Sequence, residues 1–241
     1  MEDISFGLEK GFFLSILGPN GSGKTTLLKI IAGLFKQDKG EIKINGKEIS
    51  SYGKKELASL ISYVPQTIYS VFPYSVYEIV MMGRNPYLNM FGIEKKKDVE
   101  IVEEYLRLLE ICDIKEKGIN EVSGGEAQRA FIARALAQEP ELILLDEPNA
   151  HLDIKHQILI FEILSKLIEK KNISVVSVSH NLNLIAQFTD RVIALKNGRL
   201  ILDGDKRTIL SSENINNIFE VNSVVKKNTE DDSMSIIIKK H

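Results

Sequence analysis

The chain has 241 residues, a hydrophobic fraction of 44%, a charged fraction of 27% and a net charge of −2 at pH 7. These values are typical of a globular protein with one large or two closely joined domains, and they provide no basic field that would attract nucleic acid. No run of 18 apolar residues predicts a membrane span, and the acidic start at residues 1–3 is unlike a secretory signal.

The first part of the chain alternates predicted strands and helices. An apolar run at 12–17 predicts a buried strand, and residues 24–34 are typical of a helix. Polar and apolar residues alternate at 41–44, which predicts a half-exposed strand, and Asn45-Gly46 then favours a hairpin turn. A short apolar strand is expected at 61–64.

From about 75 to 139 the pattern predicts helices and no strand. Apolar residues three and four apart define one face of a predicted helix near 99–109, and acidic residues surround the other faces. An alanine-rich helix is expected at 123–138, ending before a proline. Cys112 is the only cysteine, and its apolar neighbours favour a small core residue over a reactive thiol.

Strands return after residue 140. The predicted elements are strands at 142–145 and 173–178, helices at 155–170 and 181–188, and a hairpin of 191–196 and 199–202 around Asn197-Gly198. The polar segment 223–241 is expected to be a loosely packed tail in which residues 236–238 can form an edge strand. The whole pattern predicts the α/β class, with a nucleotide-binding core at 1–66 and 140–222 and an inserted α-helical subdomain at about 67–139.

A glycine-rich loop joins the first predicted strand to the first predicted helix. In such a loop the backbone N–H groups and the positive end of the helix dipole face phosphate oxygens. Lys24 adds a positive charge for the β- and γ-phosphates, and the hydroxyl of Thr25 can reach Mg²⁺. A surface glycine turn is the alternative. We expect ATP to be held by Gly18, Pro19, Asn20, Gly21, Ser22, Gly23, Lys24, Thr25 and Thr26.

Two carboxylates follow the apolar strand at 142–145. Ligands of open α/β sheets bind at the carboxyl ends of the strands, which is where Asp146 and Glu147 are expected. Asp146 would organise Mg²⁺, and Glu147 would orient or deprotonate the attacking water. An acidic strand end before the turn at Pro148 is the alternative, and the glycine-rich loop argues against it.

The segment Ser123-Gly124-Gly125-Glu126 precedes the alanine-rich helix. Serine followed three residues later by glutamate is a helix capping box, which accounts for Ser123 and Glu126. It leaves the two glycines unexplained, because each weakens a helical turn by roughly 1 kcal/mol relative to alanine. Glycines at a helix N-terminus let oxygens of another molecule approach the backbone, so the motif is expected to be a second phosphate-binding surface.

With Gln66 and His180, these motifs occur in the order and spacing of an ATP-binding cassette (ABC) ATPase, which the chain resembles over nearly its whole length. The resemblance implies a RecA-like P-loop NTPase core with an antiparallel β edge, within an ABC ATPase domain at 1–222. It implies a head-to-tail pair of copies with ATP between the glycine-rich loop of one and the signature segment of the other, which includes Ser123, Gly124, Gly125 and Gln128. Gln66 would sense Mg²⁺ and the attacking water, and His180 would contact the γ-phosphate.

A narrower resemblance rests on three phrases, which begin at Met82-Gly83-Arg84, Asn149-Ala150-His151 and Ser179-His180-Asn181. They are similar to the ATPases of importers for iron–siderophore complexes, haem, cobalamin and related metal chelates. This resemblance implies integral membrane permease subunits as partners, an extracytoplasmic substrate-binding protein as an indirect one, and a place on the cytoplasmic face of the membrane. Residues 69–84 would dock on the permease through Tyr69, Phe72, Tyr74, Val76 and Tyr77, or these side chains are simply core.

Three other functions remain open from the sequence. An exporter, or a transporter of another small solute, would share every catalytic residue. A non-transport ABC ATPase in DNA repair or translation usually carries long coiled coils or two cassettes, and neither feature occurs here. A non-hydrolytic binding module is disfavoured because Glu147 and His180 are both in place.

The resemblance also generates a prediction about the front of the chain. Family members usually carry about twenty more residues before Asp3, including an aromatic residue that stacks on adenine, and none of Phe6, Phe12 and Phe13 aligns with it. Because such stacking contributes about 0.5–1.5 kcal/mol, we expect ATP to bind about three- to tenfold more weakly than in a form extended by that stretch. Titration of both forms with ATP tests this expectation, and equal affinities would contradict it.

Overall fold

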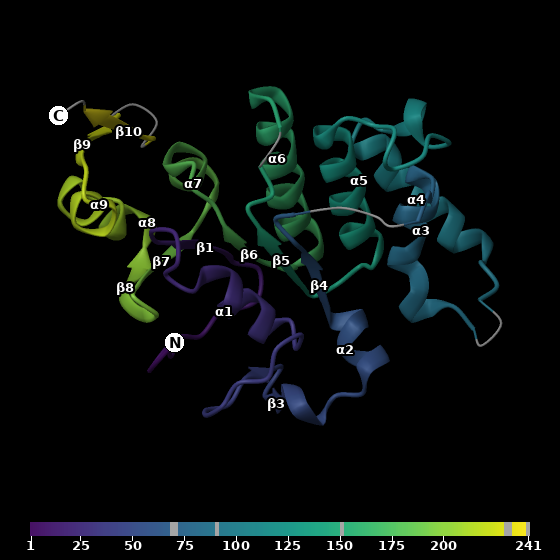
Figure 1. Cartoon of the computed structure of the whole chain (residues 1–241), viewed down its shortest axis with the longest axis horizontal. Coiled ribbons are helices and arrows are strands. Elements are labelled where there is room, and N and C mark those ends of the chain that lie inside the picture. Colours follow the sequence, from purple (N-terminus) through teal and green to yellow (C-terminus); the bar gives the residue numbers. More distant parts are fainter. Residues whose placement is uncertain (68–71, 90–91, 150–151, 229–232, 240–241) are drawn as a thin grey trace.

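The computed structural model describes residues 1–67, 72–89, 92–149, 152–228 and 233–239, and a six-stranded sheet crosses its centre (Figure 1). In sheet order the strands are β4 (Ile61–Val64), β5 (Leu142–Asp146), β6 (Ser174–Val178), β1 (Phe13–Leu17), β7 (Arg191–Lys196) and β8 (Arg199–Asp205). The first five are parallel, and β8 pairs antiparallel with β7 at the edge. The predicted α/β class with an antiparallel edge is therefore confirmed.

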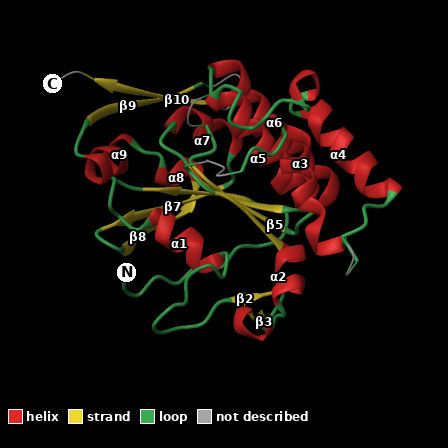
Figure 2. Ribbon diagram, turned by 45° about the vertical axis from the view of Figure 1, so that its right-hand side comes forward, coloured by secondary structure: helices red, strands yellow, loops and turns green. Residues whose placement is uncertain are grey.

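Helices cover both faces of this sheet (Figure 2). On one face lie α1 (Lys24–Ile31) and α2 (Lys54–Leu60), next to a small hairpin of β2 (Lys43–Ile44) and β3 (Lys47–Glu48) and the short 3₁₀ turn η1 (Ile49–Ser51). On the other face lies α6 (Ile154–Lys171) together with a helical region. The predicted hairpin turn at Asn45-Gly46 is confirmed, although its strands are only two residues long.

The apolar strand β5 is buried on both sides, as its unbroken run of aliphatic residues predicts. Successive side chains of a strand point to opposite faces. Ile143 and Leu145 therefore pack into the core cluster shared with the helical region, whereas Leu144 packs into the cluster around α1. This double burial fixes the strand inside the sheet, between β4 and β6, and leaves its polar end free for the site.

The helical region lies on one side of the molecule (Figure 1). It consists of α3 (Val76–Met81), η2 (Met82–Tyr87), α4 (Lys96–Leu108), η3 (Cys112–Ile114) and α5 (Gly124–Ala137). Its described residues form no strand beyond an isolated bridge between Ser75 and Gly118, as predicted. Cys112 is half-buried and packs against the apolar cluster of this region.

Arg84 is buried inside this region and connects three of its parts. It is 3% exposed, and its Nε donates to Oδ1 of Asp98 at 2.9 Å. Its Nη1 donates to the carbonyl of Ala137 at 2.6 Å and to the carboxylate of Glu139 at 3.0 Å. The neighbouring Gly83 packs so closely on α5 that an added Cβ would overlap the carbonyl of Arg134. The start of α4, the turn η2 and the end of α5 are thus held at one point.

The end of the chain is more ordered than the sequence suggested. After α7 (Leu182–Phe188), α8 (Lys206–Ile209) and α9 (Ser212–Phe219), a hairpin of β9 (Asn222–Lys227) and β10 (Met234–Lys239) packs Met234 and Ile236 into a third apolar cluster. The side chain of Asn183 on α7 exchanges two hydrogen bonds with the backbone of Ile236, at 2.8 and 3.3 Å. The expectation of a loosely packed tail was wrong, because alternate residues of β10 face inward.

Within the described ranges, no helix combines the length and the apolar character needed to cross a membrane.

Replacing Arg84 by methionine should destabilise the protein. Burial by itself would raise the pKa of Asp98, but the Lys95 backbone N–H and Arg84 hold that pKa below its usual value. Without the guanidinium, a buried carboxylate loses its partner, which costs about 3–5 kcal/mol in the free energy of unfolding. Urea unfolding at neutral pH measures the loss. Lys96→Met, which removes the exposed pair with Glu100, should change stability by less than about 0.5 kcal/mol. Equal effects of the two substitutions would contradict the role of Arg84.

Candidate active site

The glycine-rich loop lies between β1 and α1, where the sequence placed it. Gly18, Gly21 and Gly23 have φ values of 148°, 78° and 101°, a region that side chains disfavour. A Cβ on Gly18 would also overlap the carbonyl of Leu195 on β7. The loop is therefore closely packed against the sheet, with Gly23 as the N-cap of α1. Its backbone can surround an anion at a helix N-terminus.

Lys24 points back across this loop. Its Nζ donates to the carbonyls of Gly18 and Pro19 at 2.9 and 3.0 Å, and the residue is 7% exposed. Burial lowers the pKa of Lys24, and the negative charges of Glu147 and Asp146 partly oppose that shift. An ammonium group held this way has donors to offer to phosphate oxygens inside the loop.

Asp146 ends β5 beside the loop. Its Oδ1 accepts a hydrogen bond from the hydroxyl of Thr25 at 3.1 Å, and its Oδ2 accepts one from Tyr63 at 3.4 Å. Burial raises the pKa of Asp146, the hydrogen bond from Thr25 opposes this, and the charge of Glu147 adds to the rise. A hydroxyl and a carboxylate oxygen side by side are the ligands that Mg²⁺ prefers. Tyr63 was not among the predicted site residues, and its place on β4, the strand that pairs with β5, is the signal that identifies it.

Glu147 follows with φ of 52°, and its backbone N–H donates to the carbonyl of Val178 on β6. This turn aims the carboxylate between two other predicted residues. Nε2 of Gln66 donates to Oε2 of Glu147 at 2.8 Å, and Nε2 of His180 lies 2.9 Å from Oε1. The strands β4, β5 and β6 are parallel neighbours, so they bring the three proposed catalytic residues together at their carboxyl ends. A carboxylate held at both oxygens has the orientation that a general base requires.

The segment around Ser123 caps α5 as a full capping box. The backbone N–H and the hydroxyl of Ser123 both donate to Oε2 of Glu126 at 2.7 Å, and the Glu126 N–H returns a bond to the hydroxyl at 3.3 Å. These contacts lower the pKa of Glu126. In the first turn Gly124 is exposed and Gly125 is half-buried, but Gln128 is 2% exposed and faces inward. The structure therefore does not bring Gln128 to the surface of the first turn.

The two phosphate-binding segments are separate within one chain. Figure 1 places α1 and α5 in different parts of the molecule, and in the described part of the chain the polar contacts of Ser123 and of Lys24 stay within their own segments. The loop and Asp146 lie together through the contact of Thr25, whereas residues 123–125 lie at the start of α5.

The expected docking segment is only partly a surface. Tyr69 lies outside the described residues. Phe72 and Tyr74 are 61% and 37% exposed and their rings lie 5.8 Å apart. Val76 is fully buried and Tyr77 packs against the core, so both belong to the interior of the helical region, contrary to the expectation for a docking surface. Residues 150 and 151 of the phrase after the carboxylates also lie outside the described residues.

Known proteins are similar to this chain in both sequence and fold. The family described as "ABC transporter" matches residues 1–150. The chain is 38% identical to the probable iron chelatin transport ATP-binding protein of Helicobacter pylori (strain ATCC 700392 / 26695), over 91% of this chain and 87% of that protein. It is 36% identical to the petrobactin import ATP-binding protein YclP of Bacillus subtilis (strain 168), over 92% and 87%.

Solved structures give the same result. An inward-facing ABC transporter, described as of metal-chelate type, matches with a TM-score of 0.82 and 32% identity over 98% of this chain and 88% of that one. The ATP-binding cassette MJ0796, in a dimeric post-hydrolysis state with ADP and Pi, matches with a TM-score of 0.75 and 33% identity over 84% and 88%.

Proposed function

Because the chain belongs to the ABC transporter family as an ATP-binding subunit, which hydrolyses ATP, we propose that it drives the import of an iron–siderophore complex, haem, cobalamin or a similar metal chelate. The observation that carries the catalytic part is the position of Glu147 between Gln66 and His180, beside Asp146. The names of the relatives support the class of cargo, since both are transport subunits for iron chelates.

In the proposed reaction, residues 18–26 bind the phosphates of ATP. The oxygens of Thr25 and Asp146 fit Mg²⁺, with Gln66 close by, and the ion when bound would neutralise charge on the β- and γ-phosphates. Glu147 takes a proton from the water whose oxygen attacks the γ-phosphorus, and ADP leaves with the bridging oxygen. Gln66 and His180 hold the carboxylate until then, and His180 contacts the γ-phosphate.

A second copy of the chain completes the proposed site. Ser123, Gly124 and Gly125 present a helix N-terminus to solvent, which suits the γ-phosphate held by the loop of a head-to-tail partner. ABC cassettes similar to this chain form dimers, as MJ0796 does. Closing and reopening of this dimer would convert ATP hydrolysis into movement.

Membrane subunits would receive that movement. ABC ATP-binding subunits act within transporters, and the exposed rings of Phe72 and Tyr74 offer an apolar contact for a permease. In this role the chain lies on the cytoplasmic face of the membrane, and an extracytoplasmic substrate-binding protein acts on the other side.

The substitution Glu147→Gln should separate binding from turnover. The amide keeps the shape of the side chain but does not accept the proton, so we expect the rate of phosphate release to fall by about 10²- to 10⁴-fold. Binding of ATP should persist, and a dimer should accumulate on a sizing column with ATP. Glu162→Gln, an exposed change on α6, serves as the control and should hydrolyse normally. Normal turnover in the Glu147 variant would remove this residue from the role of base.

Isolation from native membranes tests the transport role. We expect the tagged protein, extracted in a mild detergent, to bring with it a many-helix permease of the metal-chelate importer type. Recovery with an exporter or a permease for another solute would correct the cargo. Recovery only from the soluble fraction, alone or with nucleic acid, would overturn the transport role while leaving the ATPase activity in place.

A further inference from the structure

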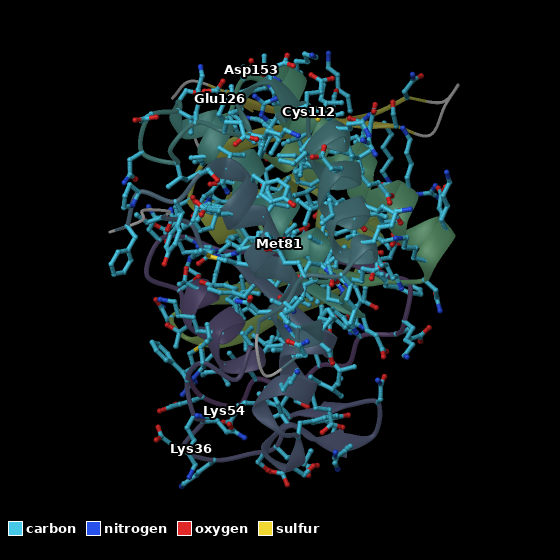
Figure 3. All side chains as sticks on the ribbon, turned by 90° about the vertical axis from the view of Figure 1, so that its right-hand side faces the viewer. Lys36, Lys54, Met81, Cys112, Glu126 and Asp153 are labelled. Atoms are coloured by element: carbon cyan, nitrogen blue, oxygen red, sulfur yellow. The ribbon has the colours of Figure 1, made fainter. Side chains whose placement is uncertain are left out.

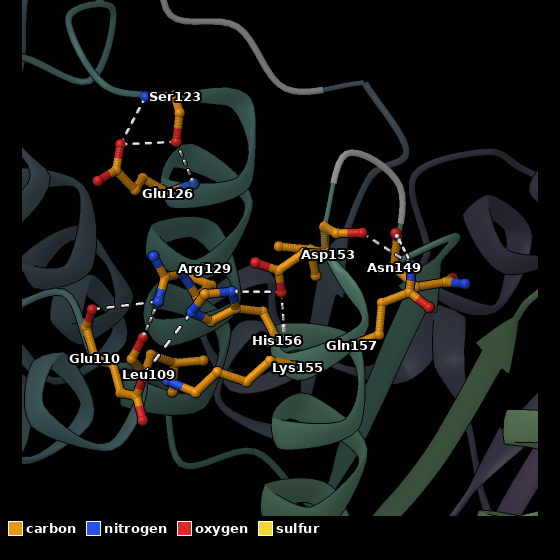
Figure 4. A network of polar contacts seen from close by, with 11 residues as sticks. Leu109, Glu110, Ser123, Glu126, Arg129, Asn149, Asp153, Lys155, His156 and Gln157 are labelled. Atoms are coloured by element: carbon orange, nitrogen blue, oxygen red, sulfur yellow. Dashed lines mark hydrogen bonds and ion pairs between the residues drawn. The ribbon is translucent and has the colours of Figure 1, made fainter.

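Three helix ends meet at one junction of the molecule: the end of α4, the first turns of α5 and the first turn of α6 (Figure 4). Figure 3 shows Cys112, which follows α4 in η3, Glu126 in the first turn of α5 and Asp153, the N-cap of α6, at the same end of that view. The helix α5 begins with residues 123–125, and α6 begins after the loop that follows Glu147. A contact across this junction therefore links the two halves of the proposed nucleotide site.

Arg129 provides the first link, between α5 and the end of α4. The residue is 7% exposed, and its Nη1 donates to the carbonyls of Leu109 and Glu110 at 3.2 and 3.3 Å. These carbonyls lie at the C-terminus of a helix, where the backbone is partly negative and a cation is favourable. The position of α5 is thus set by the end of α4.

Glu110 provides the second link, between α4 and α6. Its φ of 53° lies in the left-handed region that favours glycine, so the backbone is strained for a glutamate. The carboxylate is engaged by the first turn of α6. Nζ of Lys155 donates to its Oε2 at 2.6 Å, and Nε2 of His156 lies 3.8 Å from the same oxygen. The hydrogen bond from Lys155 lowers the pKa of Glu110.

The contacts continue from α6 into the loop after the catalytic carboxylate. Nδ1 of His156 lies 2.7 Å from Oδ1 of Asp153, and the His156 N–H donates to the same oxygen at 2.9 Å. On the next residue, Nε2 of Gln157 donates to the carbonyls of Asn149 and Leu152. The first turn of α6 thus holds both described ends of the loop.

We propose that Glu110 is a positioning residue for ATP hydrolysis, which holds the first turn of α6, and through it Asn149 and Leu152, at a fixed place relative to the start of α5. The inference rests on the proposed head-to-tail dimer. In that dimer each copy contributes its loop and carboxylates to one nucleotide and its Ser123 segment to the other. If the junction between the helices were loose, one nucleotide site of the dimer could close while the other stayed open.

The exposure of these side chains indicates that their ion pair positions the helices and contributes little to the stability of the whole protein. The side chains of Glu110 and Lys155 are 46% and 68% exposed, and ion pairs at such exposure add little to global stability. Their loss should therefore leave the fold intact and affect the geometry of the junction.

The left-handed backbone at Glu110 allows a clean test with Glu110→Gly. Glycine relieves the backbone strain, so the variant should unfold at the same or a higher temperature than the wild type while lacking the carboxylate. We expect kcat for ATP to fall by about threefold to tenfold and KM to change by less than about twofold, because the glycine-rich loop is untouched.

The chain offers a matched control at Glu220. This residue also follows a helix with φ of 57° and also forms an exposed pair, with Lys196 at 2.9 Å, but it lies at the end of α9. Glu220→Gly should leave kcat and KM unchanged. Lys155→Met should lower kcat in the same direction as Glu110→Gly, and the double variant should be no slower than Glu110→Gly alone. Wild-type kcat in Glu110→Gly, or an equal loss in Glu220→Gly, would overturn the proposal.

Amide hydrogen exchange separates this inference from the dimer itself, because it needs no nucleotide. Faster exchange of residues 152–160 in Glu110→Gly, but not in Glu220→Gly, supports the link across the junction. Unchanged exchange would overturn it. Failure of the Glu147→Gln protein to dimerise with ATP would instead overturn the shared site, while the exchange result would still decide whether Glu110 holds α6.

Discussion

The structure depends on one constraint: neighbouring parallel strands that are buried on both faces have their carboxyl ends on the same side of the sheet. The strand β5 is covered by one apolar cluster through Ile143 and Leu145 and by another through Leu144. Polar groups at its carboxyl end would lose free energy if they turned back into either apolar cluster. They meet the ends of β4 and β6 instead, which is why Glu147 lies between Gln66 and His180.

This edge concentrates charges that are partly desolvated. Burial raises the pKa of Asp146 and lowers the pKa of Lys24, so each charged form is less favourable here than in water. A cation beside Asp146 and a polyanion beside Lys24 would offset both penalties. The site is thus electrostatically prepared for a metal ion and a phosphate chain, and a substrate such as ATP–Mg²⁺ carries both.

The helical region has a different physical basis. Its core is apolar, but its internal geometry is set by buried polar contacts, above all those of Arg84 with Asp98 and the end of α5. Specific hydrogen bonds hold α5 in one orientation, where apolar packing by itself tolerates several. Since α5 begins with the exposed Ser123 segment, this rigidity becomes important when that segment has to meet a nucleotide bound by another copy.

The sequence by itself determined the class of fold and predicted most residues of the proposed site, because both depend on local pattern. Alternating elements predicted the core, a glycine-rich loop between strand and helix predicted phosphate binding, and two carboxylates after an apolar strand predicted the chemistry. Only the tertiary structure placed Tyr63 on Asp146, buried Val76 and the side chain of Gln128, and packed β10 on Asn183. It also joined Glu110 to Lys155, 45 residues along the chain. Such contacts join residues that are far apart in the sequence. They depend on how the segments pack, and a local pattern of residues does not show which distant segments will pack together.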